Sequence, residues 1–574
     1  MSSDHGELER VFRAGFHQRV LDRLWDGPEA THSIEDTPLI VGSLALLGRL
    51  DEALALVKEL ATDPAVPTSV AVESRFFLVV GFCHAGLYAD AATWAGHNVA
   101  HARAREPRTR FFVFQGIALL RYFTGRLGKA RLSSKRALKE AVVARFQYGR
   151  LLALDLWGHI LVQRGEVHAG LRTLQQAMRF ADAIGSTGHR MSIECARLAY
   201  ENRHGRKDDE LESALARITA SAIDNLYTHR SAWLELAFRG ALSGDAERAR
   251  EALDRAAEHA IAEADFRART WYFMTQAFVS RLDRSHEDVR SALEDAARAL
   301  AKGEDQILYA ELLARDAVLG SRSVDPARVA HLACTTGSLV SRALVAISRG
   351  APLDSSDANE SPLWALLASR DEPLVRIERA MERGWLGLLP ILSETEPGRH
   401  LFFVRDQLIV DNQGMLQRVD SLPGHARELL LLLHAAERTK EELVREVWRV
   451  QRYAPNLHDA VVHTAIARLR RALGAHGDWV ETTARGYVLR GDVVLVMANE
   501  HVPRSTPPES SAVDELSSRI ESILTRGPAS ASDIAEALRV SQATVLRRLR
   551  EMQAQHLVKR EGAGKRTRYL RSGA

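Results

Sequence analysis

Cysteine is scarce in this chain of 574 residues. Its three cysteines, Cys83, Cys195 and Cys334, are far apart and form no C-x-x-C pair. A disulfide framework or a zinc site needs cysteines in closer and more regular spacing, so we expect neither. The sequence instead predicts buried thiols in a cytoplasmic protein.

Long apolar runs are missing too. No window holds the roughly 18 uninterrupted apolar residues of a membrane span, and the first twenty residues mix Asp, Glu, Arg and His without an apolar stretch. Neither membrane spanning nor secretion is supported. We therefore expect a cytoplasmic protein without a membrane partner.

The common motifs of enzyme chemistry are absent as well. There is no H-E-x-x-H, no G-x-S-x-G and no Rossmann fingerprint, and the 22 histidines lack metal-ligand spacing. Ordinary core or surface histidines are the simpler interpretation. We expect no enzymatic activity, no metal and no cofactor.

What is present points to a soluble protein of several domains. The length exceeds that of one domain, hydrophobic residues make up 46% and charged residues 26%. Positive charge collects late in the chain: residues 512–574 hold 12 Lys/Arg against 7 Asp/Glu, and residues 397–497 hold 14 against 12. Residues 1–396 hold 50 against 53. A nucleic-acid-binding region needs such a concentration of cations.

A glycine turn followed by Ala and Leu at helical spacing recurs through the first half of the chain. Copies begin at nearly even intervals at Gly48, Gly86, Gly125, Gly165, Gly205 and Gly244, and Arg284 stands in the next position. Each glycine predicts a left-handed cap that ends one helix before the next begins. The repeat is therefore a helical hairpin, which buries its apolar face only by stacking on a neighbour.

This pattern resembles tetratricopeptide repeats, with a period of roughly 39 to 40 residues instead of about 34. Longer repeats of this kind resemble the solenoid sensor domains of bacterial signal-responsive activators. The resemblance implies a repeat domain over residues 1–350 whose groove binds a protein, peptide or small-molecule effector. An inert spacer or a dimerisation scaffold is the alternative, and a homodimer remains open.

The remaining chain divides by composition. Residues 351–362 read as a loop or linker, and we assign 351–396 to a linker with bridging helices. Beyond residue 396 the spacing of apolar and turn residues predicts a small antiparallel hairpin sheet, three helices and two more strands. These elements occupy 400–419, 426–436, 439–450 with Thr439 and Glu442 as a capping box, 457–474, and 479–490.

The third of these helices has two unlike faces. Val462, Ile466, Leu469 and Leu473 form one apolar stripe, which must be buried. Opposite them lie Thr464, Arg468 and Arg471, with Arg470 to the side. Arginine's planar fork suits both guanine edges and phosphate oxygens, so this face can bind DNA. A solvated surface helix is the alternative.

The order of elements, with IARLRRAL and VETTARGYVL, resembles the winged-helix domain of OmpR/PhoB-type regulators over residues 397–497. The resemblance implies that Thr464, Arg468 and Arg471 face the major groove and that Arg470 binds a phosphate. It also implies that the wing, with Thr483 and Arg485, contacts the minor groove.

A second candidate DNA-binding domain follows the Pro- and Ser-rich linker at 498–511. Residues 512–574, with SQATVLRRLREM and the basic hairpin KREGAGKRTRYLR, resemble MarR/ArsR-like winged helix-turn-helix domains. Val545, Leu549 and Met552 should point inward, and Ser532 and Ser541 should be N-caps. The DNA contacts implied are Ser541, Gln542, Thr544, Arg547, Arg548, Arg550, Lys565, Arg566 and Arg568.

The sequence thus predicts a mainly α protein, with a TPR-like α-solenoid followed by two winged-helix (α+β) domains. We expect a bacterial transcriptional regulator that binds double-stranded DNA and responds to an effector. The alternative is a non-enzymatic scaffold whose winged helices bind proteins.

Overall fold

The structure is a computed structural model of the whole chain. It describes residues 2–25, 32–206, 210–258, 265–282, 285–301, 305–319, 325–393, 399–404, 407–411, 416–419, 422–496, 520, 523–524, 527–538, 545–546, 549, 552–553, 558–562 and 567–571. The chain divides into two compact units, Met1–Met497 and Ala498–Ala574. The three segments predicted as 1–350, 351–396 and 397–497 thus belong to one unit.

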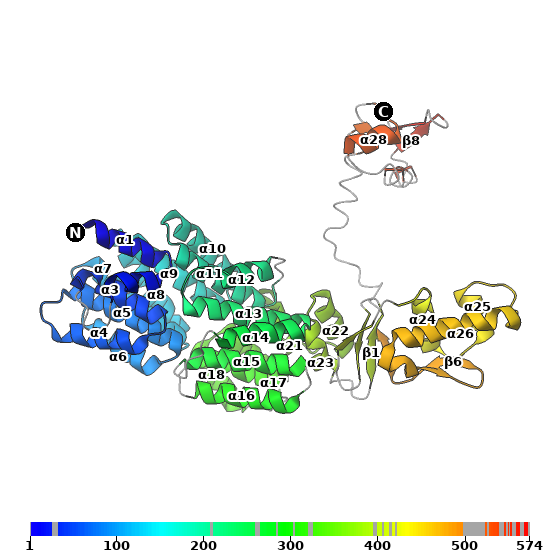
Figure 1. The fold of residues 1–574 in the computed structure, drawn as a ribbon, viewed down its shortest axis with the longest axis horizontal. Coiled ribbons are helices and arrows are strands. Elements are labelled where there is room, and N and C mark those ends of the chain that lie inside the picture. Colours follow the sequence, from blue (N-terminus) through cyan, green and yellow to red (C-terminus); the bar gives the residue numbers. More distant parts are fainter. Residues whose placement is uncertain are drawn as a thin grey trace. The chain divides into compact units, whose positions relative to one another are not determined.

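Helices dominate the first unit, and the expectation of a mainly α protein is confirmed (Figure 1). From α3 onward they pair as hairpins, α3 with α4 and so on to α17 with α18. Their bounds are α1 Ser2–Arg13, α2 His17–Leu24, η1 Ile34–Asp36, α3 Thr37–Leu46, α4 Leu50–Thr62, α5 Thr68–Ala85, α6 Tyr88–Val99, α7 Pro107–Phe123, α8 Leu127–Val143, α9 Gln147–Gln163, α10 Val167–Ala183, α11 Thr187–Arg203, α12 Leu211–Thr219, α13 Leu226–Ser243, α14 Ala246–Glu258, α15 Phe266–Leu282, α16 His286–Leu300, α17 Gln306–Leu319, α18 Pro326–Thr336 and α19 Leu339–Arg349.

The two helices of a hairpin have different environments. Side chains are buried almost all around α5, as expected of a helix covered on every side. Helix α8 instead buries a narrow stripe that includes Ala130, Ala137 and Ala141, and exposes Lys129 and Lys135. The first helix of each hairpin therefore lies inside the array and the second outside.

The predicted glycine caps are confirmed. Gly48, Gly86, Gly125, Gly165, Gly205 and Gly244 all have a positive φ. At Gly86 the amides of Gly86 and Leu87 donate to the carbonyls of Cys83 and Phe82, which satisfies the end of α5. Residue 284 lies outside the described part of the chain.

Each of these glycine turns also contacts the start of a helix that comes several hairpins later in the chain. The pairs are Gly48 with Leu226, Gly86 with Arg267, Gly125 with Gln306, Gly165 with Arg342, and Gly205 with Trp385. Each partner follows its glycine by a nearly constant, long interval of sequence. Nearby, the buried Tyr88 hydroxyl donates to Asp305 at 2.9 Å. The array therefore curls back onto itself.

The prediction of a loop or linker at 351–362 is wrong. The segment is mostly helical and is bound to the array: Asp357 accepts two hydrogen bonds from Arg342, at 2.6 and 2.8 Å, and Ser361 bonds the buried His204 at 2.9 Å. Asp357 and Ser361 are buried and fix the segment to the array, whereas Ser355, Ser356 and Asn359 are exposed. The helices here are α20 Ser355–Glu360, α21 Pro362–Ala368, α22 Pro373–Glu382, η2 Leu386–Leu388 and α23 Leu389–Ser393.

A four-stranded sheet, which we call sheet A, follows. Its order is β3-β2-β1-β7, with β1 and β7 parallel and the other neighbours antiparallel. The predicted hairpins are present, whereas the parallel β7 was not predicted. The strands are β1 His400–Phe403, β2 Leu408–Val410, β3 Leu416–Arg418 and β7 Val493–Val496.

Strands β1, β2 and β7 of sheet A are buried on both faces, whereas Gln417 and Arg418 of the edge strand β3 are exposed. Leu401 and Phe403 of β1 belong to the core shared with α15–α17 and α21–α23, whereas Phe402 belongs to the core of the helices that follow. Successive side chains of a strand point to opposite faces, so one strand contributes to two cores. Figure 1 shows β1 between α22 and α24.

Three helices and a second sheet complete this unit. The capping box of Thr439 and Glu442 is confirmed. The second sheet has the order β4-β6-β5. The elements are α24 Ala426–Ala435, β4 Arg438–Thr439, α25 Lys440–Val447, α26 Pro455–Ala472, η3 Gly474–Trp479, β5 Val480–Thr482 and β6 Gly486–Leu489.

The second unit has a small core of its own. Val545, Leu549 and Met552 are buried, as predicted. The predicted N-cap at Ser532 is wrong, because Ser530 Oγ accepts from the Asp533 amide and Asp533 accepts from the Ser530 amide. Its described elements include α28 Ala531–Leu538 and the antiparallel strands β8 Val558–Glu561 and β9 Arg568–Arg571.

Two further expectations can be compared with the structure. Cys83 and Cys195 are buried as predicted, but Cys334 is exposed because it lies on the outer helix α18. Of the helices that the structure describes, none combines the length and apolarity that crossing a membrane requires.

We expect Gly86→Ala to destabilise the protein more than Gly185→Ala. Both glycines have a positive φ, which costs a side chain about 1–2 kcal/mol. A Cβ at Gly86 would also lie 3.1 Å from the Arg267 backbone nitrogen, whereas Gly185 has no atom within 4 Å. Urea titration should show the larger loss for Gly86→Ala. Equal losses would mean that the contact between turns contributes little.

Acid should destabilise the array. Burial, and then nearby arginines, lowers the pKa of His84 and of His204 to about 3 from 6.5. The unfolded chain therefore binds protons below pH 6.5 that the folded chain excludes. The free energy of unfolding is therefore highest above that pH. It falls with acidification, by about 1.4 kcal/mol per pH unit for each histidine. Urea midpoints measured from pH 7.5 to about 5 check this.

His204→Gln should flatten this pH dependence, because a neutral amide, which cannot titrate, replaces the imidazole that bonds Ser361. The matched control is His97→Gln, which removes an exposed imidazole from the outer helix α6. An unchanged slope in His204→Gln would contradict the assignment.

Candidate nucleic-acid interface

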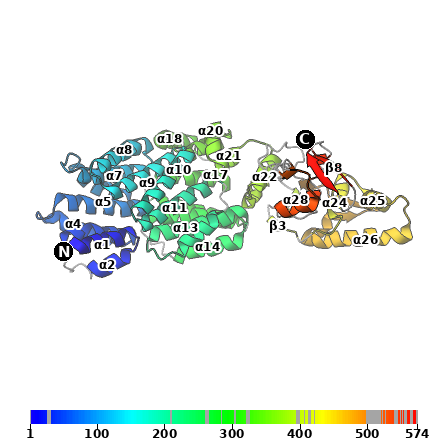
Figure 2. The same cartoon turned by 90° about the horizontal axis from the view of Figure 1, so that it is seen from above.

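Helix α26 is anchored by the predicted apolar stripe. Val462, Ile466, Leu469 and Leu473 are each at most 1% exposed and pack in the core with α24 and α25. Pro455 stands in its first turn, where the missing N–H costs nothing. The predicted buried face is confirmed, and it fixes which side of α26 turns outward. The helix forms one margin of this part of the unit in Figure 2.

The outward face carries three of the predicted side chains. Thr464, Arg468 and Arg471 are all exposed, and they recur at helical spacing on the side opposite the stripe. An exposed guanidinium keeps its five N–H donors available for carboxylate, phosphate or base edges. The structure therefore brings these three side chains together on one accessible surface.

Arg470 has a different place from the one predicted. Its Nε and Nη2 donate to the Val480 carbonyl at 2.9 and 2.6 Å, and Nη2 donates to Thr482 Oγ1 at 2.8 Å. Four residues after the buried Ile466, Arg470 lies beside the buried stripe, within reach of β5. It joins α26 to β5, so we assign it a structural role in place of the predicted phosphate contact.

Thr483 and Arg485 occupy the turn between β5 and β6. The Thr483 hydroxyl accepts from the amides of Arg485, at 3.2 Å, and Gly486, at 2.9 Å, and donates to Glu437. Thr483 thus shapes the turn, and Arg485 is exposed at its tip. A side chain at residue 486 would collide with the Arg438 carbonyl at 1.9 Å, which explains the glycine.

Two apolar residues of the outward face were not predicted. Leu457 is 71% exposed and Val461 43% exposed, in the first half of α26. They precede Thr464 and Arg468 by two helical turns, so the same helical periodicity could have found them. The outward face is therefore apolar in its first half and cationic in its second. Beside it, a shallow groove runs between α26 and the segment around His425 and Trp448.

In the second unit, the described part of the predicted interface is the β8–β9 hairpin. Arg568 is exposed and pairs in register with Glu561, and Lys559 and Arg560 are exposed on the opposite strand. This hairpin can meet an anion. The other predicted contacts, Ser541, Gln542, Thr544, Arg547, Arg548, Arg550, Lys565 and Arg566, lie outside the described residues.

Comparison with known proteins adds no family. No protein-family model matches the sequence, and no curated protein matches it. Within the described residues, no group of three or more His, Cys, Asp or Glu side chains could hold a metal ion. The outward face of α26 presents the exposed guanidinium groups of Arg468 and Arg471 and the exposed apolar side chains of Leu457 and Val461.

Removing the Arg470 side-chain bonds should loosen β5. We expect Arg470→Met to lower the local free energy of opening by about 1–3 kcal/mol, because it leaves the carbonyl of the buried Val480 and the Thr482 hydroxyl without their donor. Arg471→Met, on the exposed side, is the matched control and should change it by less than about 0.5 kcal/mol. Hydrogen exchange of peptides covering 480–489 measures both, and equal protection in the two variants would contradict the structural role.

Proposed function

We propose that this chain is a DNA-binding transcriptional regulator. The observation that carries the proposal is the outward face of α26, where Thr464, Arg468 and Arg471 are exposed opposite a fully buried stripe. Residues 397–497 would act as an OmpR/PhoB-type winged helix, with α26 in the major groove and Arg485 of the wing near the minor groove. Bidentate arginine contacts to guanine would supply sequence discrimination.

The apolar half of α26 extends this proposal. Leu457 and Val461 have no charged atoms, and side chains of this kind contact the C5-methyl group of thymine in the major groove. We therefore expect a binding site with thymine next to the bases read by Arg468.

The second unit supports a second contact with the same DNA. Its exposed Lys559, Arg560 and Arg568 would form the basic wing of a MarR/ArsR-like domain. Two readers on one chain, joined by the linker at 498–511, raise affinity through effective concentration. A homodimer would double the number of readers.

The array of residues 1–350 would be the sensor. As a TPR-like solenoid it offers an inner surface to a protein, peptide or small-molecule effector, in a cytoplasmic regulator without a membrane partner. Binding there would change how the two readers engage DNA.

Replacing both exposed arginines of α26 should weaken DNA binding. We expect Arg468→Ala/Arg471→Ala to lower affinity at least about tenfold for duplexes selected from a random pool. A lost phosphate contact would reduce the salt slope by about one. Arg248→Ala/Arg290→Ala, which removes two exposed arginines from outer helices of the array, is the matched control. Fluorescence anisotropy at several salt concentrations measures both quantities.

The same assay tests the second reader with Arg547→Ala/Arg550→Ala. Unchanged binding with either pair replaced would remove that helix from the mechanism. If the unaltered chain fails to bind any duplex at low salt, the regulator proposal is wrong.

That result would favour a second function, a scaffold whose winged helices bind proteins. The exposed Leu457 and Val461 are the observation in its favour, because apolar side chains beside a groove also suit a protein partner. Leu457→Ala would then weaken partner binding while Arg468→Ala would not.

A further inference from the structure

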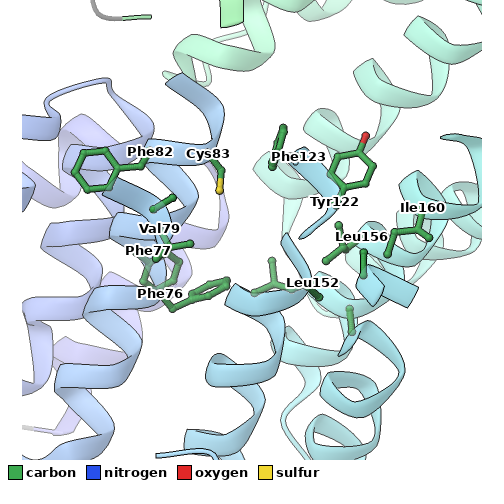
Figure 3. Close-up of a cluster of buried hydrophobic side chains, with 14 of the residues drawn as sticks. Phe76, Phe77, Val79, Phe82, Cys83, Tyr122, Phe123, Leu152, Leu156 and Ile160 are labelled. Carbon is green, nitrogen blue, oxygen red and sulfur yellow. The ribbon is translucent and has the colours of Figure 1, made fainter. Parts of the chain in front are cut away.

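The inner helices of the array surround a cavity of about 330 Å³. Part of its wall is seen in Figure 3, where Phe76 and Phe77 come from α5, Tyr122 and Phe123 from α7, and Leu152 from α9. This volume lies in the range of sites for small molecules. The cavity has room for a ligand the size of a metabolite and is too small for a folded protein.

Four arginines of the wall share one arrangement. Each guanidinium lies over an aromatic ring that also lines the cavity, and each is paired with a carboxylate that does not line it. The sets are Arg13 with Tyr148 and Glu9, Arg203 with Trp271 and Glu235, Arg230 with Tyr227 and Asp265, and Arg267 with Phe123 and Asp305. The wall therefore offers N–H donors beside flat ring faces.

Arg230 has a hydrogen-bond donor left over. Its side chain is 4% exposed, and its Nη2 donates to Asp265. Its Nη1 is buried and has no hydrogen-bond partner among the described residues. An unsatisfied buried donor on a charged group is costly, and an anionic oxygen in the cavity would satisfy it.

A histidine also lines the wall near Arg230. His84 lines the same wall and stacks on Tyr227, with ring centroids 4.8 Å apart. Burial lowers its pKa to about 3, and Arg267 and Arg230 contribute to the lowering. Its imidazole is therefore neutral at physiological pH and adds no charge to those of the four arginines.

Two acidic side chains, Asp155 and Glu311, also line the wall. Asp155 lies 3.3 Å from His159 and 3.4 Å from His189. Glu311 accepts from Arg315 at 3.0 Å. Glu311 is thus paired with its own arginine, whereas Asp155 Oδ1 has no hydrogen-bond partner among the described residues, so we place the anionic group of a ligand at Arg230 and not at Asp155.

We propose that this cavity binds a small organic anion with an aromatic or other flat apolar body. Its oxyanion group would bind Arg230 Nη1, and its body would lie against the rings of Tyr227 and Phe123. That this ligand is the effector rests on the proposed function; that it binds does not.

The position of Trp364 connects the cavity with the rest of the unit. Trp364 of α21 lines the cavity, and its neighbours Leu363 and Leu366 belong to the core that includes one face of sheet A. The opposite face of sheet A belongs to the core that holds α26. A ligand that shifts α21 would therefore act on sheet A through direct packing.

Two fluorescent probes of nearly equal shape test the proposal on the full-length protein without DNA. Anilinonaphthalene sulfonate carries an anionic group on an aromatic body, and phenylnaphthylamine has the same body without the charge. We expect one saturable site for the sulfonate. We expect Arg230→Gln to weaken sulfonate binding about tenfold or more and to change phenylnaphthylamine binding less than about twofold.

Arg230→Gln leaves Asp265 without its partner, so Arg230→Gln/Asp265→Asn is the companion variant that removes both charges. The new side-chain amide oxygen would still be able to accept from the Ala268 amide at the start of α15, as Asp265 does at 3.0 Å. Arg248→Gln, on the outer helix α14, is the matched control and should bind both probes normally.

Ala196→Trp fills the cavity from α11 and should abolish binding of both probes. Sulfonate binding unchanged in both Arg230 variants would overturn the role of Arg230. Equal weakening of both probes in them would overturn the anionic ligand. Retained binding in a folded Ala196→Trp protein would overturn the cavity as the site. None of these measurements uses DNA. The proposal of a ligand site can therefore fail while the regulator proposal holds, and the reverse is also possible.

Discussion

Close contact between successive turns of the helical array is the constraint on which the first unit depends. The turn glycines lie against helix starts much later in the chain, at distances that leave little space for a side chain. This contact stacks one turn of the array on the next. It also forces the inner helices to face one another, which creates the cavity and brings Arg203, Arg230 and Arg267 to a common wall. Without it the hairpins would form an open array.

Sheet A provides the second constraint. Because the side chains of β1, β2 and β7 alternate between two cores, the array and the helices around α26 are packed against opposite sides of these three strands. The outward face of α26 is in turn fixed by the stripe from Val462 to Leu473 and by Arg470 on β5. The place of each arginine around the axis of α26 thus decides that Arg468 is accessible and that Arg470 bonds β5.

Local patterns in the sequence predicted a substantial part of this structure. The six glycine caps, the capping box at Thr439 and the buried stripe of α26 depend on residues within one or two helical turns of each other, and periodicity reveals such relations. The exposed Thr464, Arg468 and Arg471 followed from the same periodicity.

What escaped prediction depends on contacts between distant residues. The pairing of β1 with β7 joins strands that are separated in the chain by three helices and a second sheet, and the cavity joins residues from Phe12 to Trp364. Polar composition suggested a linker at 351–362, but Arg342 and His204, the partners that bind it, lie elsewhere in the chain. Arg470 was misplaced because its partner, the Val480 carbonyl, is a backbone atom that no side-chain pattern reports.

The two-sided burial of sheet A has a consequence for how this protein could be rearranged. A domain whose terminal sheet already exposes one face to solvent can be transferred between proteins with little loss of stability. Here, separation between residues 393 and 399 would leave Leu401, Phe403, Leu408 and Val410 facing water, on strands that no longer have a cover. The α26 segment is therefore not a free-standing cassette, and gene fusions that exchange it must carry its helical cover along or replace that apolar face.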